Sequence, residues 1–155
     1  MVSSGFLIES TGKFLICHAS SLDGKFSYSD QMWSVPKGLV EHNETILEAA
    51  FRETLEETSL NIESIYDDGF AKIYENLFKY KTSKKLVQIS YANVLIDITK
   101  RKLVCKSLVL PFNIPENDFF VWVDWITAKN MVSKRQKELF SDDNFERRKQ
   151  LTKTK

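Results

Sequence analysis

The stretch from Gly38 to Leu60 constrains the fold of this chain most, because its spacing predicts one helix with its acidic residues on a single face. At about 100° per residue, Glu53, Glu56 and Glu57 fall within roughly 100° of one another. The opposite arc is largely apolar and holds Leu47, Ala50, Phe51, Thr54 and Thr58. We therefore expect a helix from residue 43 or 44 to about 58, capped by Asn43, with one side in a core. Like charges three and four residues apart destabilise a helix, so a cation is expected among the carboxylates.

Charge is distributed unevenly along the chain. Residues 37–57 carry two basic residues against six acidic ones, and residues 72–106 carry nine basic residues against two acidic ones. An acidic helix beside basic strands suits a metal-assisted site for a phosphorylated ligand. Solvated lysines at strand edges are the simpler interpretation of most of these basic residues.

Length and composition indicate one globular domain, since 155 residues with 43% hydrophobic and 28% charged residues are ordinary for a soluble protein. We place the domain at residues 1–140 and expect the polar, basic tail at 141–155 to fray. Cys17 and Cys105 form no disulfide framework, and we expect both to be buried free thiols in a reducing compartment. The sequence shows neither a signal peptide nor an apolar stretch of about 20 residues, so we predict a cytoplasmic protein without a membrane partner.

The hydrophobic pattern predicts strands on both sides of the acidic helix. Residues 5–8 and 13–18 predict a hairpin, followed by a loop at 20–30 and a short apolar run at 32–35. Residues 62–80 and 86–98 predict two long strands joined at 81–85, and residues 119–125 predict another strand. A helical stretch at 128–140, with a break near 133, closes the domain. This order predicts an α/β domain with a mixed sheet.

The register of the charged residues resembles the signature of the Nudix hydrolase family. Gly38 is followed by Glu44 after five residues and by Arg52-Glu53 after seven more, and Glu56-Glu57 completes the pattern G-x5-E-x7-R-E-U-x-E-E-x-G-U, where U is apolar. The resemblance implies a Nudix-type α/β/α sandwich with a mixed central sheet. The preceding Trp33-Ser34-Val35-Pro36-Lys37-Gly38 also looks like the W-x-x-P-K-G sequence of family members that cleave dinucleoside polyphosphates and of relatives that act on capped RNA ends.

The resemblance implies hydrolysis of a nucleoside diphosphate linked to another moiety, with Mg²⁺ or Mn²⁺ as cofactor. Its metal ligands would be Glu53, Glu56, Glu57 and the carbonyl of Gly38, and carboxylates are ligands that hard cations prefer. Glu56 is our first choice as catalytic base and Glu53 the second. Some family members use a glutamate outside the signature, for which the candidates here are Glu75, Glu116 and Asp118.

The residues themselves predict a supporting ion-pair ladder. Glu44, Glu48 and Arg52 follow one another at intervals of four, so Arg52 can be held by either glutamate while it orients a ligand carboxylate. Two positions depart from the signature. Thr54 stands where an apolar residue is usual, and Ser59 replaces the glycine that ends the helix, which makes the end of the helix the uncertain part of the pattern.

Other residues offer weaker predictions of substrate binding. Lys37 could pair with a substrate phosphate, and Tyr74, Phe78 and Tyr80 share one face of a predicted strand and could stack a base. Core packing is the competing interpretation for these aromatic residues. His18 and His42 are too isolated to suggest a zinc site.

The sequence leaves the substrate open. Dinucleoside polyphosphates are the first expectation, ADP-ribose or similar nucleotide conjugates the second, and the 5′ end of capped or triphosphorylated RNA a further one. A non-catalytic nucleotide-binding module is the rival class, although such modules commonly lose the signature glutamates. The partner is expected to be a small nucleotide or an RNA 5′ end, and the choice between a monomer and a homodimer stays open.

Overall fold

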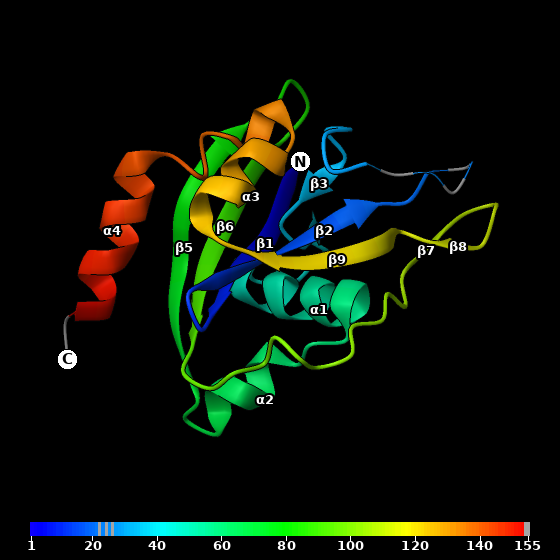
Figure 1. Ribbon diagram of the computed structural model, residues 1–155. Coiled ribbons are helices and arrows are strands. Elements are labelled where there is room, and N and C mark those ends of the chain that lie inside the picture. The colour runs from blue at the N-terminus through cyan, green and yellow to red at the C-terminus, as the bar shows by residue number, and fades with distance from the viewer. Residues whose placement is uncertain (22, 24, 26, 154–155) are drawn as a thin grey trace.

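The computed structural model describes residues 1–21, 23, 25 and 27–153, and shows a sheet between two layers of helices (Figure 1). Positions 22, 24 and 26 of the predicted loop and positions 154 and 155 of the predicted tail lie outside the described residues. The main sheet has the strand order β3-β2-β1-β6-β5, with β4 added to β1 and β9 to β2. Its strands are β1 (Val2–Ser10), β2 (Lys13–Ala19), β3 (Trp33–Ser34), β4 (Lys37–Leu39), β5 (Ala71–Lys81), β6 (Leu86–Val94) and β9 (Asn117–Val123).

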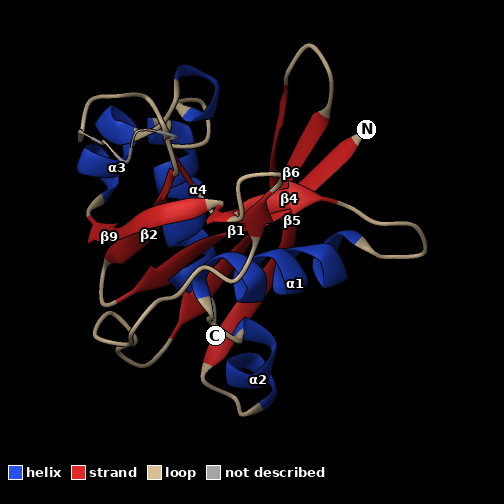
Figure 2. Cartoon of the chain, turned by 90° about the vertical axis from the view of Figure 1, so that its right-hand side faces the viewer, coloured by secondary structure: helices blue, strands red, loops and turns tan. Residues whose placement is uncertain are grey.

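The sheet is mixed, because β1 and β6 run parallel while its other strand pairs run antiparallel. Side chains on β1 alternate between the two faces, so Phe6 and Ile8 enter one hydrophobic cluster and Leu7 enters the other. The first cluster is covered by α1 (Ile46–Thr58) and α2 (Ile62–Asp67), and the second by α3 (Trp125–Met131) and α4 (Asp142–Lys153). Figure 2 shows these two helix pairs on opposite sides of the sheet. The expected α/β/α sandwich is confirmed.

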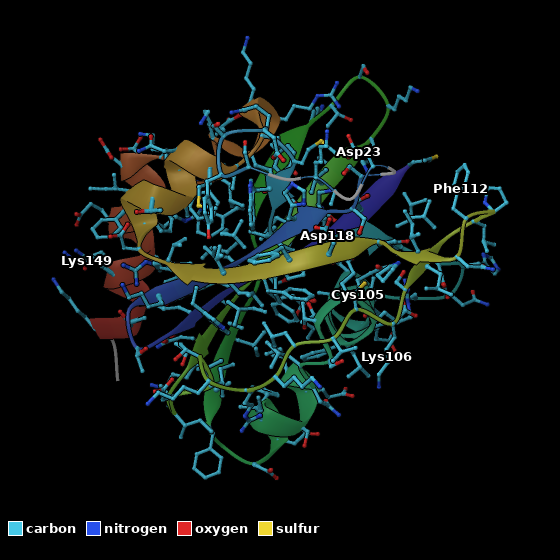
Figure 3. The ribbon with its side chains drawn as sticks, turned by 45° about the vertical axis from the view of Figure 1, so that its right-hand side comes forward. Asp23, Cys105, Lys106, Phe112, Asp118 and Lys149 are labelled. Atoms are coloured by element: carbon cyan, nitrogen blue, oxygen red, sulfur yellow. The ribbon has the colours of Figure 1, made fainter. Side chains whose placement is uncertain are left out.

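The smaller elements lie at the edges of this sandwich. A 3₁₀ turn at Lys134–Gln136 follows α3, and β7 (Leu108–Val109) pairs with β8 (Ile114–Pro115) in a separate hairpin. Figure 3 labels Phe112 at the outer end of that hairpin, where its side chain points away from the body of the protein. Within the described residues, no helix combines the length and the apolar character needed to cross a bilayer.

The predicted start of the acidic helix, at residue 43 or 44, was wrong by two or three residues. α1 begins at Ile46, and its cap is Thr45, whose hydroxyl accepts a hydrogen bond from the Glu48 N–H while the Glu48 carboxylate accepts one from the Thr45 N–H. Asn43, the predicted cap, instead has a φ of 64° in the preceding turn. This reciprocal arrangement satisfies two backbone donors at the helix start, which a lone asparagine cap would not.

The prediction of one strand over residues 62–80 was also wrong. Residues 62–67 form α2, whose cap Asn61 accepts a hydrogen bond from the Ser64 N–H, and β5 begins only at Ala71. A bulge between Tyr74 and Phe78 then breaks the expected alternation of faces, and Asn76 there has a φ of 51°. The local cap and the bulge override a strand-like hydrophobic pattern.

The end of β6 and the start of α3 also differ from the predicted boundaries. β6 ends at Val94 rather than at 98, and Trp125, expected in a strand, begins α3 under the Asp124 cap. The expected break near residue 133 is present between α3 and the 3₁₀ turn.

The C-terminal segment forms a helix instead of fraying. α4 packs on the sheet through Arg148, which donates to the Glu9 carboxylate of β1 and lies over the rings of Phe14, Trp125 and Phe145. A buried guanidinium surrounded by aromatic faces explains why a polar sequence adopts a docked conformation. The boundary between domain and tail that we drew at residue 140 remains a prediction.

Candidate active site

The site is built where β4 passes the middle of α1. A Cβ atom added to Gly38 would lie 2.1 Å from the carboxylate carbon of Glu53, so this backbone and this side chain approach each other as closely as only glycine permits. β4 is held to β1 by pairing of Gly38 with Ser4, and the Ser4 hydroxyl donates to the carbonyl of Ile46 at the helix start. The Gly38 backbone and the Glu53 carboxylate are thereby brought together.

Arg52 organises the acidic face of α1. Its Nε donates to Glu44 at 2.7 Å, and its Nη1 donates to Glu53 at 2.8 Å and to Glu56 at 3.2 Å. Its Nη2 donates to Glu44 and to the carbonyl of Leu39. The expected ladder is confirmed for Glu44, whereas Glu48 is used in the helix cap. Arg52 supplies the cation that the cluster of acids requires.

Glu57 is the most deeply buried carboxylate of the group. The residue is 5% exposed, its Oε1 accepts a hydrogen bond from the Asn117 amide at 2.9 Å, and its Oε2 has no hydrogen-bond partner within the described residues. Burial first, and then the neighbouring Glu53 carboxylate, raise the pKa of Glu57 to about 9. Without a cation, this carboxyl is therefore protonated at neutral pH.

Glu56 is the accessible member of the group, with a side chain that is 45% exposed. Partial burial and the Glu53 charge raise the pKa of Glu56, while Arg52 opposes the rise. Its carbonyl accepts hydrogen bonds from the backbone N–H groups of Lys106 and Ser107 at 2.7 and 3.3 Å. Figure 3 shows Cys105 and Lys106 on the segment that passes beside α1.

The donor set fits a hard divalent cation. Arg52 occupies one oxygen each of Glu53 and Glu56, and Asn117 occupies one oxygen of Glu57, so the second oxygen of each carboxylate is the one left for a ligand. The Oε2 of Glu57 has no partner within the described residues, and the Glu53 charge adds to burial in raising the pKa of Glu56 and of Glu57, so a cation among these oxygens would relieve the repulsion. Within the described residues, no three acidic, histidine or cysteine side chains already converge as a closed set of ligands.

Comparison with known proteins identifies the family. The profile of the NUDIX domain matches residues 2–142, which is most of the chain. The chain belongs to the Nudix family. The RNA pyrophosphohydrolase of Pseudoalteromonas atlantica (strain T6c / ATCC BAA-1087) is 29% identical over 114 residues, which span 68% of this chain and 64% of that relative, less than two thirds of its length.

Solved Nudix structures share the fold at low identity. A binary complex of the C. elegans Ap4A hydrolase has a TM-score of 0.62 at 20% identity, and covers 89% of this chain and 91% of its own. The MutT protein from Methanosarcina mazei Go1 has a TM-score of 0.61 at 20% identity, covering 96% of this chain and 94% of its own. At these identities, the likeness shows the fold alone.

Ser59 ends the Nudix helix as the usual glycine would. It has a φ of 71°, its N–H donates to the Leu55 carbonyl, and its hydroxyl donates to the Val104 carbonyl at 2.6 Å. A left-handed serine is strained by its side chain, and the hydroxyl bond to the adjoining segment offsets part of that strain. The substitution leaves the geometry of the helix end intact.

The predicted substrate-binding residues separate into two groups. Lys37 and Tyr80 line a cavity beside β4, whereas Phe78 is 3% exposed in the core. Tyr74 stacks on Tyr91 at 5.6 Å and donates its hydroxyl hydrogen to the Leu151 carbonyl of α4. Packing thus occupies Tyr74 and Phe78, and base stacking by these two residues stays a prediction that this arrangement does not favour.

The three candidate acids outside the signature lie in different surroundings. Glu116 lies near enough to raise the pKa of Glu57 and to oppose the lowering of the Lys37 pKa, whereas Glu75 is exposed on β5. Asp118 accepts a hydrogen bond from His18 Nδ1 at 2.6 Å, and Asp30 accepts one from His18 Nε2 at 2.6 Å. Glu116 is therefore the acid outside the signature that the structure brings to the site.

Sequence reasoning missed Asn117, the buried amide that holds Glu57. The residue lies 60 positions beyond its partner, at the start of β9, and no local pattern links the two. Its place between Glu116 and Asp118, both considered as candidates, was the only available signal.

Proposed function

We propose that this protein is a metal-dependent hydrolase that cleaves a pyrophosphate linkage in a nucleoside diphosphate joined to another moiety. The observation that carries the proposal is the intact carboxylate group of the Nudix helix, with Glu53 against the Gly38 backbone and a buried, partnerless oxygen on Glu57. A buried carboxyl group with one oxygen left without a partner is costly for a purely structural helix unless a ligand compensates it.

Glu53, Glu56, Glu57 and the carbonyl of Gly38 would hold the metal, for which Mg²⁺ is the first choice and Mn²⁺ the second. When bound, the metal would offset the charge of the diphosphate and lower the pKa of a coordinated water. Arg52 would act as the positioning residue, because its contacts with Glu53 and Glu56 fix one oxygen of each.

Glu56 is proposed as the residue that takes the proton from the attacking water. Its raised pKa and its partial exposure suit a group that must accept a proton near neutral pH. Glu53 is the second candidate, although its Oε1 is held by Arg52 at 2.8 Å. Glu116 is the third, because it lies near the carboxylates without belonging to the helix.

Dinucleoside polyphosphates are proposed as the first substrate class. The relative described as an RNA pyrophosphohydrolase supports the triphosphorylated or capped 5′ end of RNA as a second class. ADP-ribose and similar conjugates form the third class. A cytoplasmic location remains part of the proposal, and so does the choice between a monomer and a homodimer.

The purified protein with Mg²⁺, assayed on one substrate from each class, tests the proposal. Glu56→Gln should lower kcat by 10²-fold or more, the scale expected for loss of general-base catalysis, without changing the melting temperature. Glu63→Gln, on the exposed side of α2, is the matched control. If Glu56→Gln keeps full activity, the role assigned to Glu56 is wrong. A separate experiment, hydrolysis in ¹⁸O water, would show which phosphorus is attacked.

The non-catalytic alternative makes the opposite prediction. A binding module would retain nucleotide affinity and release no product with any of the three substrate classes under Mg²⁺ or Mn²⁺. All three glutamates of the helix are present, which favours the enzyme.

A further inference from the structure

The buried histidine of β2 lies between two carboxylates. His18 is 0% exposed, its Nδ1 contacts Asp118 of β9 at 2.6 Å, and its Nε2 contacts Asp30 of the β2–β3 loop at 2.6 Å. Ionised carboxylates only accept hydrogen bonds, so both ring nitrogens must carry a proton to make these two contacts. His18 is therefore a buried cation that joins a loop to a strand.

The partner strand is irregular beside this histidine. β9 pairs with β2 so that Phe119 faces His18 and Asn117 faces Ala19, and the register shifts between these two pairs. Asp118 is the extra residue, with no residue of β2 opposite it. A bulge of this kind bends the strand and changes the direction in which its side chains point.

The bulge determines which side of the sheet Asn117 reaches. The ring of Phe119 lies 6.4 Å from that of Trp33, which belongs to the hydrophobic cluster on the face opposite α1. In a regular strand the side chains alternate, so Asp118 would point towards α1 and Asn117 away from it. The structure shows the reverse, because Asp118 contacts the histidine beside Trp33 and Asn117 donates to Glu57 of α1. The extra residue thus aims the Asn117 amide at Glu57.

Two contacts of unequal strength hold the bulge. The backbone N–H of Asn117 donates to Sγ of Cys105 at 3.4 Å, and sulfur is a weak acceptor. A hydrogen bond between a cation and a carboxylate is about twice as strong as one between neutral groups. Figure 3 labels Asp118 and Cys105 on opposite sides of β9. The contact of Asp118 with His18 is the stronger of the two, and we expect it to fix the bulge.

The second carboxylate ties the same histidine to the β2–β3 loop. The Oδ2 of Asp30 accepts from the Ser27 N–H at 3.1 Å, and its Oδ1 accepts from the Met32 N–H at 3.0 Å. The indole Nε1 of Trp33 donates to the Ser27 carbonyl at 3.0 Å. Asp30 is thus fixed within residues 27–33, and His18 connects this loop segment to the bulge in β9.

We propose that His18 is a positioning residue for the metal site: through Asp118 it fixes the bulge that aims Asn117 at Glu57, and through Asp30 it couples the loop at residues 27–33 to the same bulge. An Asn117 amide that no longer holds Glu57 leaves this carboxylate less ordered, which raises the entropic cost of binding a cation. The effect on metal binding rests on the function proposed above, whereas the placement of Asn117 does not.

The placement of Asn117 is tested in the metal-free protein. NMR gives the rate at which the side-chain amide hydrogens of Asn117 exchange with water. Asp118→Ala should raise this rate about tenfold or more, because the amide that donates to Glu57 becomes exposed. Asp118→Asn, which keeps an oxygen that accepts from His18 Nδ1, should change the rate less than about twofold. An unchanged rate in Asp118→Ala would overturn the proposal.

A variant just beyond the other end of β9 controls for a general loss of stability. Asp124→Ala removes the carboxylate that accepts from the Thr127 N–H and caps α3. It should lower Tm and leave the exchange rate of the Asn117 amide unchanged. An equal rise of that rate in Asp118→Ala and in Asp124→Ala would show a global effect and would overturn the proposal.

The link to the metal site is tested by a double-mutant cycle on Mn²⁺ affinity, measured by calorimetry at a temperature at which every variant is folded. His18→Gln should raise Kd for Mn²⁺ about tenfold in the otherwise unmodified protein, and less than about twofold in the Asn117→Ala background, where the path is already broken. Equal effects in the two backgrounds would overturn the proposal, since a merely structural role of His18 is additive with the loss of Asn117.

If His18→Gln does not fold, Asp118→Ala takes its place in the cycle, with the same expected outcome. An unmodified protein that binds no Mn²⁺ would count against the proposed function, and the exchange rate of the Asn117 amide would still decide whether His18 and Asp118 position that side chain.

Discussion

The backbone of Gly38 and the carboxylate of Glu53 are so close that a single methyl group cannot be placed between them: a Cβ on Gly38 would lie 2.1 Å from the carboxylate carbon and from Oε2. The contact joins β4 to α1 at the centre of the proposed site. Gly38→Ala should therefore push Glu53 away from its partner Arg52 and lower kcat/KM by about 10²-fold, the loss expected when a catalytic group is displaced by about 1 Å. Steady-state kinetics measure the effect.

Gly12→Ala is a control for a general loss of stability, because nothing lies within 4 Å of its added Cβ, although its φ of 77° makes it the more strained substitution. If Gly38→Ala retains full activity, the close approach has no role in catalysis.

The raised pKa of Glu57 predicts pH-dependent metal binding. A cation must displace the proton that burial and Glu53 hold on this carboxyl, so Mg²⁺ affinity should rise with pH, by up to about tenfold per unit, until the pKa of about 9 is passed. Calorimetry in buffers of different ionisation enthalpy should detect release of about one proton per metal at pH 7.

Glu57→Gln should abolish that proton release and flatten the pH profile of metal affinity. The same shift lowers the free energy of unfolding as pH rises from 4.5 to about 9, because the folded state holds a proton that the unfolded state releases across that range. Proton release that persists in Glu57→Gln would assign the bound proton to another carboxyl.

The two carboxylates that contact His18 predict that its contribution to stability falls as pH rises. Burial opposes the charge on its ring, but the hydrogen bonds with Asp30 and Asp118 outweigh burial and raise the pKa of His18 above 6.5. Its stabilisation is therefore present below about pH 6.5 and disappears as pH rises through the folded-state pKa. His18→Gln should destabilise the protein more at pH 5.5 than at pH 9 in urea unfolding, and an equal loss at both pH values would contradict the role of its charge.

The ion pair between Arg148 and Glu9 predicts a large loss of stability when Arg148 is replaced. Arg148→Met leaves the Glu9 carboxylate without its buried cation, and loss of one partner of a buried ion pair costs about 3 kcal/mol. Thermal and urea unfolding should show this loss. Arg147→Met, on the same helix, should cost less than about 1 kcal/mol, because its ring contact with Phe78 is at 5.9 Å and it has no carboxylate partner among the described residues. Equal losses in both variants would show that helix propensity, and not the ion pair, holds α4.

The acidic face of α1 was predictable because it depends on spacing within one helix, and so was its pairing of Arg52 with Glu44. The mixed sheet followed from the order of strand and helix patterns. The helix cap at Thr45 and the short α2 were not foreseen, since each depends on a local hydrogen bond that competes with the hydrophobic pattern. The bulge in β5 was not foreseen because it depends on the neighbouring strand, where the Ser90 hydroxyl accepts a hydrogen bond from the Asn76 N–H.

Contacts between residues that are distant in the sequence could not be predicted, for a different reason. Asn117 meets Glu57 across 60 positions, and Arg148 meets Glu9 across 139, so neither pair leaves a periodic trace in the sequence. The cavity beside β4 could be predicted only in part. The excess of lysine in residues 72–106 was apparent, but Arg135, which also lines the cavity, lies outside that range.

Ser59 has a mechanical consequence as well as a conformational one. Its hydroxyl, together with backbone bonds from Val104 to Thr58 and from Lys106 and Ser107 to Glu56, fastens the last turn of α1 to the base of the β7–β8 hairpin. The segment that leads into the hairpin is thus bonded directly to the turn that carries Glu56 and Glu57. Glycine at position 59 would end the helix with less strain and would remove one of these four attachments.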